Sequence, residues 1–115
     1  MKMNIETKDG VLLARVEQPQ IAADSAEAFK SQILGALPDD GARIAVDLSN
    51  VDFMDSSGLG VLVSLLKAVR PSGDLVLYGM KPSVNEILRL THLDSVFACE
   101  EQEDAAVARF SASAS

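Results

Sequence analysis

Hydrophobic and polar residues alternate near the start of the chain, which is the pattern of a half-exposed β-strand. Met3 and Ile5 are apolar, and the residues around them are polar. Asp9 and Gly10 form a pair that favours a tight turn, and a second, mostly apolar stretch follows over 11–16. These features predict an N-terminal β-hairpin.

Helical spacing of apolar residues appears in the segments that follow. The first such segment comes after Asp24 or Ser25, either of which can cap a helix. The second follows Ser56 and extends to about Val69. The third begins at Pro82, a residue that fits the first turn of a helix. These segments are therefore predicted to be helices.

Short apolar runs between the predicted helices indicate β-strands. One run begins near Arg43 and alternates as far as Leu48. Another, over 75–78, is continuously apolar, as expected for a strand that is covered on both faces. Residues 96–99 are predicted to form an edge strand, and residues 105–110 a last helix.

Strands that alternate with helices predict a mixed sheet with a parallel core and helices packed against it. We therefore expect a single α/β domain over residues 1–110, with a central sheet of four to five strands. The chain length of 115 residues also suits one domain. The Ser/Ala tail at 111–115 has low complexity and is predicted to be disordered.

Composition and charge narrow the possible partners. The net charge is −7, and the ten Lys and Arg residues are scattered, which argues against a nucleic-acid partner. No apolar run is long enough to cross a bilayer and no secretory signal is visible, so we expect a cytoplasmic protein without a membrane partner. Cys99 is the single cysteine and allows neither an intramolecular disulfide nor a cysteine-based metal site. No cofactor or metal is expected.

The most informative segment covers residues 50–60, between a predicted strand and a predicted helix. Binding sites in α/β proteins occur at such positions. Asp55, Ser56 and Ser57 are all suitable N-cap residues. One interpretation is therefore that this segment serves only as a helix cap.

The helix after this segment is apolar around roughly 220° of its circumference, far more than the stripe with which a surface helix faces its core. Either the helix is deeply buried, or its additional apolar surface is a docking face for another protein. A chain of 115 residues has difficulty burying a helix on all sides. We therefore expect a docking surface beside Ser56 that includes Leu65.

A family resemblance becomes apparent in this segment. The run Asp-Ser-Ser-Gly-Leu-Gly-Val in a strand-to-helix context closely resembles the motif of the anti-sigma factor antagonist family, which has the STAS fold. The resemblance covers most of the chain. It rests on residues 55–61 together with residues 25–27, 46–49, 53–54, 73–75 and 87–93.

The resemblance implies a partner-switching function without catalysis. Family members bind an anti-sigma factor, often a serine kinase, and so release a sigma factor for transcription. The kinase phosphorylates the first serine of the motif, which is Ser56 here with Ser57 as second candidate, and a serine phosphatase removes the phosphate. The chain is expected to be a monomer or a weak dimer. The expected partner-binding residues are Asp55, Ser56, Ser57, Gly58, Leu59, Val61, Ser64, Leu65 and Ala68.

One departure from the family lies before the first helix. The family usually carries Gly-Glu-Ile/Leu-Asp there, whereas this chain has Pro-Gln-Ile-Ala at 19–22. Ala22 thus stands where the family has an aspartate close to the phosphorylated serine. This difference leaves open a partner that is an anti-sigma factor without kinase activity.

Other functions fit the sequence less well. A serine hydrolase would need a glycine where Met54 stands, and His92 is the only available base. A dinucleotide site would need a third glycine at Val63. A receiver domain would need a cluster of acidic residues at the end of an early strand to hold a magnesium ion, and residues 16–18 do not supply one. A STAS domain acting as a scaffold or as an accessory subunit of a lipid transporter remains as the alternative. Such a domain needs no phosphorylatable serine, so the motif favours the switch.

Overall fold

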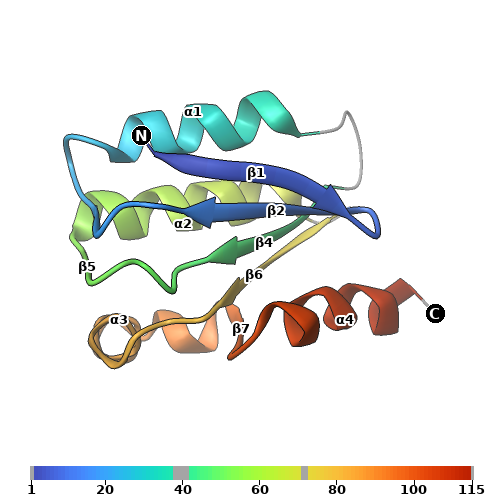
Figure 1. Cartoon of the computed structure of the whole chain (residues 1–115). Helices are drawn as coiled ribbons and strands as arrows, with labels where there is room; N and C mark the ends of the chain where they lie inside the picture. The colour runs from blue at the N-terminus through green and yellow to red at the C-terminus, as the bar shows by residue number, and fades with distance from the viewer. Residues whose placement is uncertain (1, 38–41, 71–72, 115) are drawn as a thin grey trace.

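The computed structural model describes residues 2–37, 42–70 and 73–114, of which 111–114 are described in their backbone alone. Figure 1 shows helices and strands in the alternation that the hydrophobic pattern predicts. The elements in chain order are β1 (Met3–Lys8), β2 (Val11–Val16), β3 (Gln20–Ile21), α1 (Ala26–Ala36), β4 (Arg43–Asp47), β5 (Phe53–Met54), α2 (Ser56–Val69), β6 (Asp74–Tyr78), α3 (Pro82–Leu90), the 3-10 turn η1 (Leu93–Ser95), β7 (Ala98–Glu100) and α4 (Glu103–Ala114).

The main sheet has five strands in the order β1-β2-β4-β6-β7. β1 and β2 are antiparallel and the remaining neighbours are parallel. Asp9 and Gly10 both adopt positive φ, at 53° and 79°, as a tight hairpin turn requires. The predicted α/β domain, with its mixed sheet and its N-terminal hairpin, is therefore confirmed.

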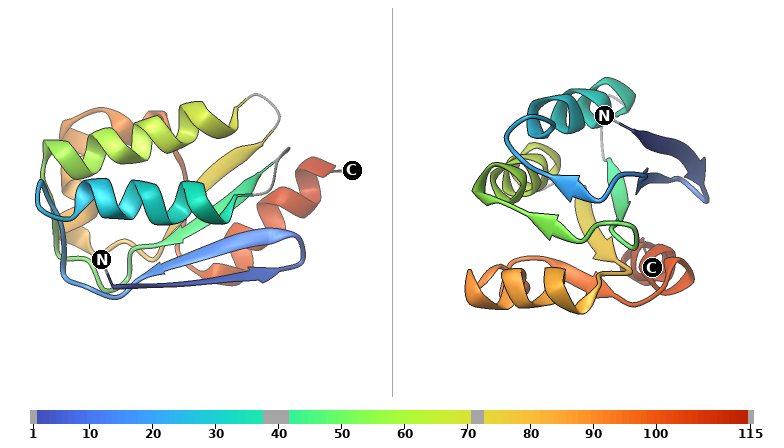
Figure 2. Two further views of the ribbon diagram at one scale, coloured as in Figure 1. Left: turned by 90° about the horizontal axis from the view of Figure 1, so that it is seen from above. Right: turned by 60° about the vertical axis from the view of Figure 1, so that its left-hand side comes forward.

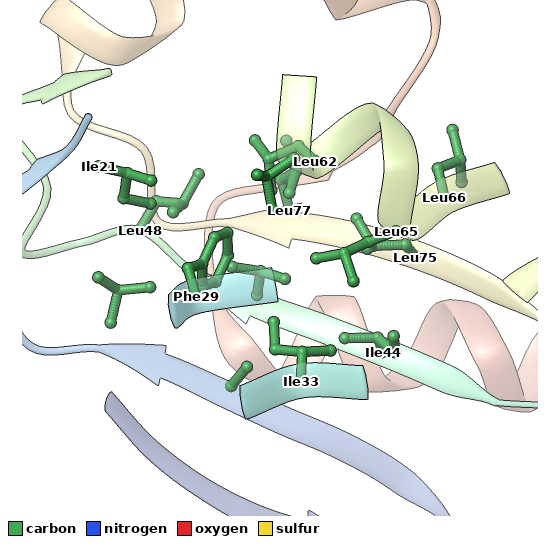
Figure 3. Close-up of a cluster of buried hydrophobic side chains, with 14 of the residues drawn as sticks. Ile21, Phe29, Ile33, Ile44, Leu48, Leu62, Leu65, Leu66, Leu75 and Leu77 are labelled. Atoms are coloured by element: carbon green, nitrogen blue, oxygen red, sulfur yellow. The ribbon is translucent and has the colours of Figure 1, made fainter. Parts of the chain in front are cut away.

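Helices cover both faces of this sheet (Figure 2). α1 and α2 pack on one face, where Phe29, Ile33 and Leu62 are fully buried (Figure 3). α3 contributes Val84 and Leu88 to the same core. α4 covers the other face, where its apolar side chains pack against β2, β4 and β6. The central strands are thus buried on both faces, which explains the continuous apolar run in β6.

The structure shifts several predicted boundaries and adds one feature. β7 begins at Ala98, two residues later than predicted from 96–99, because residues 93–95 form the η1 turn. α4 begins at Glu103, and its backbone reaches Ala114, so it continues beyond residue 110 into the segment that was predicted as a disordered tail. Ser115 and the segment 38–41, which separates α1 from β4, lie outside the described residues. The short parallel pair of β3 and β5 was not predicted.

A polar cluster holds α4 against the sheet. Arg15 Nη2 donates to Glu103 Oε1 at 2.7 Å, and the Tyr78 hydroxyl donates to the same oxygen at 3.0 Å. Arg15 also forms an ion pair with Glu6 at 2.6 Å. The hydrogen bond from Arg15 is the main reason why the pKa of Glu103 lies below its ordinary value.

The lowered pKa of Glu103 gives a testable pH dependence. The ionised carboxylate stabilises the fold above the ordinary glutamate pKa, and this contribution is lost as the pH falls through the lowered pKa. Glu103→Gln should lower the free energy of unfolding by about 0.5–1 kcal/mol at neutral pH, since the cluster is partly exposed. Denaturant titrations should show this difference shrinking as the pH falls below the ordinary glutamate pKa and through the lowered pKa of Glu103. A difference that stays constant with pH would contradict the prediction.

Candidate functional site

Asp55 caps the first turn of α2. Its Oδ1 accepts hydrogen bonds from the backbone N–H groups of Ser57, at 2.9 Å, and of Gly58, at 3.1 Å. The backbone oxygen of Asp55 accepts from Leu59 N at 3.1 Å. These bonds satisfy N–H groups that a helix otherwise leaves without partners in its first turn. Among the three candidate cap residues, the structure therefore selects Asp55 and leaves the two serine hydroxyls free of that role.

Asp55 also joins α2 to the segment that precedes α1. β3 and β5 pair in parallel, with Ile21 opposite Met54, and both side chains are buried. Asp55 N donates to Ile21 O at 3.3 Å, and Ala23 N donates to Asp55 Oδ2 at 3.1 Å. One aspartate thus fixes the loop at 22–23 beside the start of α2. Sequence reasoning missed this pairing because each strand has only two residues.

Ser56 and Ser57 occupy the first two positions of α2 and are exposed. Neither hydroxyl forms a hydrogen bond with any residue that the structure describes. Ser56 directly follows the Asp55 carboxylate in the chain, and no ion pair among the described residues brings a lysine or arginine to this carboxylate. The corner between the end of β5 and the start of α2, which we call the Ser56 corner, therefore presents an accessible hydroxyl next to a negative charge. Ala22, which stands in place of the family aspartate, is half-buried.

Two glycines in the first turns of α2 have different environments. A Cβ atom on Gly58 would lie 2.4 Å from the backbone oxygen of Ile21, so only glycine allows α2 to approach β3 this closely. A Cβ atom on Gly60 would meet nothing within 4 Å. Gly60 is exposed, and an alanine there would favour the helix more than glycine does. Packing within the described chain therefore explains Gly58 and leaves Gly60 unexplained.

The predicted docking face on α2 requires a correction. The side chain of Leu65 is 0% exposed, and those of Leu59 and Val61 are at most 9% exposed. The prediction that Leu65 lies on a docking surface is wrong, because α2 packs against the sheet and also against α1. The apolar arc of α2 is wide because one side of the helix packs against the sheet and another side packs against α1. The alternative of deep burial, which the sequence left open, is the one observed.

The accessible part of the predicted site is consequently narrower. Ser56, Ser57 and Ala68 are exposed, while Asp55 and Ser64 are half-buried. All of them lie on α2 or at its cap, so the structure does bring these predicted residues to one helix. The other predicted binding residues on α2 are buried, so a partner cannot reach them: Gly58, Leu59, Val61 and Leu65.

Phe53 is an exposed aromatic residue next to this corner that sequence reasoning did not select. Its side chain is 46% exposed, whereas its neighbour Met54 is buried. Lys81 Nζ pairs with Asp52 Oδ1 at 2.5 Å, and Ser83 Oγ donates to Asp52 O at 2.9 Å, so the start of α3 holds the chain just before Phe53. Alternation along β5 places Phe53 on the face opposite to the buried Met54, but a strand of two residues is too short for the sequence to reveal this.

The remaining candidate residues do not form a second site within the described part of the chain. His92 has a positive φ of 61° and donates its backbone N–H to Arg89 O at 3.1 Å, so it ends α3. Burial is the main cause that raises the pKa of the Cys99 thiol. Residues 2–37, 42–70 and 73–114 contain no cluster of three His, Cys, Asp or Glu side chains suited to a metal ion. No helix among these residues has the length and apolar character needed to cross a membrane.

Comparison with known proteins places these features in a family. The family model for the STAS domain matches residues 2–106. BtrV of Bordetella bronchiseptica, a protein named as an anti-sigma factor antagonist, is 30% identical over 111 residues, which cover 96% of this chain and 95% of BtrV.

Solved structures agree with this assignment. The crystal structure of an anti-sigma factor antagonist from Mycobacterium paratuberculosis matches with a TM-score of 0.84 at 25% identity, over 94% of this chain and 92% of that chain. The murine anion transporter Solute Carrier 26 family member A9 matches with a TM-score of 0.79 at 18% identity, over 93% of this chain and 18% of the transporter, which shows a shared fold alone. The chain belongs to the STAS domain family, as one of its anti-sigma factor antagonists.

Proposed function

We propose that the corner formed by Ser56, Ser57 and Phe53 binds an anti-sigma factor, and that phosphorylation of Ser56 ends this binding. The observation that carries the proposal is the exposed Ser56 hydroxyl, which forms no hydrogen bond with the described residues and is not needed as the helix cap. Because Asp55 performs the capping, Ser56 can be modified without loss of a structural bond.

A phosphate at Ser56 would change the charge of this corner substantially. It adds about −1.5 to −2 charges and three acceptor oxygens. The Asp55 carboxylate next to it carries the same sign, so the phosphate gains no ion pair from this neighbour. A bound partner would have to desolvate the phosphate or be displaced, at a cost on the order of 1–3 kcal/mol for a mispaired polar group, and more for a charged one. We therefore expect the affinity for the partner to fall at least about tenfold.

The fold itself should tolerate the phosphate. The N-terminus of α2 carries partial positive charge, which favours an anion at this position. Repulsion from Asp55 opposes this effect. Since Ser56 is exposed, the two contributions act near solvent and are both small. Phosphorylation should therefore act on the interface and leave the stability of the domain nearly unchanged.

Gly60 supports an interface on this side of α2. Its missing side chain serves no contact within the described chain, and it follows Ser56 by about one turn of the helix. The absence of a Cβ atom lets another polypeptide approach the helix backbone closely. Ser64 and Ala68, which are also small, continue the same accessible side of α2.

The remaining parts of the proposed switch concern the other proteins. A serine kinase, which can be the anti-sigma factor itself, would modify Ser56 or, as second choice, Ser57, and a serine phosphatase would reverse the modification in the cytoplasm. The chain would act by binding alone, with no catalytic residues of its own. The alternative role, as a scaffold or an accessory subunit of a lipid transporter, would make no use of an unbonded, exposed serine at the start of α2.

Binding experiments with charge variants test the proposal. Ser56→Ala should capture an anti-sigma factor from the native cytoplasm, and the purified partner should then bind Ser56→Glu at least about tenfold more weakly than Ser56→Ala. Ala108→Glu is a matched control, because it adds the same charge on α4 at the opposite face of the sheet. The affinity of the Ala108→Glu variant for the anti-sigma factor should equal that of the unmodified protein. Equal affinities of Ser56→Ala and Ser56→Glu would reject the proposal.

A further inference from the structure

The outer edge of β1 offers main-chain groups for pairing. β1 is the first strand in the sheet order, and no described segment pairs with its outer side (Figure 1). Glu17 N donates to Lys2 O at 2.9 Å, so Lys2 directs its main-chain groups toward β2. Because this direction alternates along an antiparallel pair, Met3, Ile5 and Thr7 direct their N–H and C=O groups outward.

This edge lacks a bulge and a proline, two of the features that prevent strands from pairing between molecules. It does carry the charged residues Lys2, Glu6 and Lys8, which restrict the registers in which a second strand can pair. β1 pairs with β2 in one continuous register from Met3 to Lys8, without a bulge, and it contains no proline. The opposite edge strand, β7, has only three residues, and short edge strands discourage pairing. β1 is thus the edge at which another strand can add to the sheet.

We propose that a second copy of this chain pairs antiparallel with β1, with Asn4 opposite Asn4 of the second copy. In this register Met3 lies opposite Ile5 of the second copy, and both residues are half-buried apolar side chains that pack against the core below α1 and α2. Lys2 lies opposite Glu6 of the second copy, and both are exposed. The two-fold symmetry of such a pair repeats each contact.

Charge selects this register over those centred further along β1. If Ile5 lay opposite Ile5, Lys2 would face Lys8 of the second copy. If Glu6 lay opposite Glu6, two carboxylates would face each other directly. Like charges directly opposite each other destabilise a strand pair, whereas opposite charges stabilise it. With Asn4 at the centre, Lys8 lies outside the paired segment 2–6, where it keeps its ion pair with Glu103 at 3.6 Å.

The proposed dimer leaves the Ser56 corner accessible. α2 packs against β6, and β2 and β4 lie between β6 and β1 in the sheet order. A second copy at β1 would therefore extend the sheet on the side away from α2. Dimerisation and partner binding can then be tested independently of each other.

Sedimentation equilibrium with charge-reversal variants tests the register. The wild-type protein should dimerise with increasing concentration. Lys2→Glu places a carboxylate opposite Glu6 of the other copy, and the two-fold symmetry makes this happen twice. The dissociation constant of the dimer should therefore rise about tenfold. The double variant Lys2→Glu/Glu6→Lys should restore the dimer, and circular dichroism should first confirm the fold of this variant, because Glu6→Lys also removes the ion pair with Arg15. Lys67→Glu, on the exposed side of α2, is the matched control and should have no effect.

Amide hydrogen exchange gives a second readout that does not depend on any variant. The N–H groups of Met3 and Ile5 should exchange more slowly at high protein concentration, because they form the new bonds. A wild-type protein that stays monomeric up to about 1 mM would overturn the proposal. So would a dimer that Lys2→Glu leaves unchanged, or one in which the amides of Met3 and Ile5 gain no protection.

Discussion

Leu65→Lys is expected to unfold the domain or to destabilise it by about 4 kcal/mol or more. Leu65 is a fully buried residue of α2, which packs against the sheet and against α1. No acidic side chain is buried there to pair with an ammonium group. A domain of this size has a total stability of about 5–15 kcal/mol, so the change removes a large share of it. Thermal and denaturant unfolding, followed by circular dichroism, would measure the loss.

Ala68→Lys is the matched control for Leu65→Lys. Ala68 lies three residues further along α2 and is exposed, so the same lysine side chain can extend into solvent there. The free energy of unfolding should stay within about 0.5 kcal/mol of the wild type. Partner affinity should fall, because the lysine stands on the accessible side of α2. If both variants were equally stable, the burial of Leu65 would be contradicted.

Gly58→Ala should destabilise the domain by about 1–3 kcal/mol or more, despite adding only one methyl group. The new Cβ atom would lie 2.4 Å from the backbone oxygen of Ile21, and 3.0 Å from the Cγ2 atom of the same residue. A backbone oxygen in a paired strand cannot move aside without disturbing the pairing of β3 with β5. Either α2 moves away from β3 or the pair opens. Denaturant titration gives the stability, and partner titration shows whether the Ser56 corner moves with it.

Gly60→Ala reverses the sign of this effect. The added methyl group meets nothing within 4 Å, and alanine favours a helix over glycine by about 0.5–1 kcal/mol. The variant should therefore be more stable than the wild type, but it should bind the anti-sigma factor more weakly. Unchanged partner affinity would show that no polypeptide approaches α2 closely at Gly60.

The periodicity of the sequence predicted most of the fold, because the core is built from regular elements. Alternation in β1 and helical spacing in α1 each concern one contact face, and local sequence determines such a face. The continuous apolar run in β6 identified a strand covered on both sides. The motif at 55–61 then located the strand-to-helix corner. The fold class, the order of the main elements and the family could thus be predicted without the structure.

The features that the sequence did not reveal depend on tertiary contacts. A wide apolar arc on a helix fits either burial between two layers or a docking face, and only the position of α1 beside α2 decides between them. The pairing of Ile21 with Met54 involves strands too short to show periodicity. The different environments of Gly58 and Gly60 likewise follow from where β3 lies. Phe53 became a candidate only once its exposure was known.

Titration of an anti-sigma factor with unmodified protein and with protein stoichiometrically phosphorylated at Ser56 tests the central claim most directly. Calorimetry should give at least about tenfold weaker binding for the phosphorylated form, while the melting temperatures of the two forms remain nearly equal. Equal affinities would contradict the proposed switch. So would a loss of binding that is accompanied by unfolding of the phosphorylated domain, since the phosphate would then act on the fold and not on the interface.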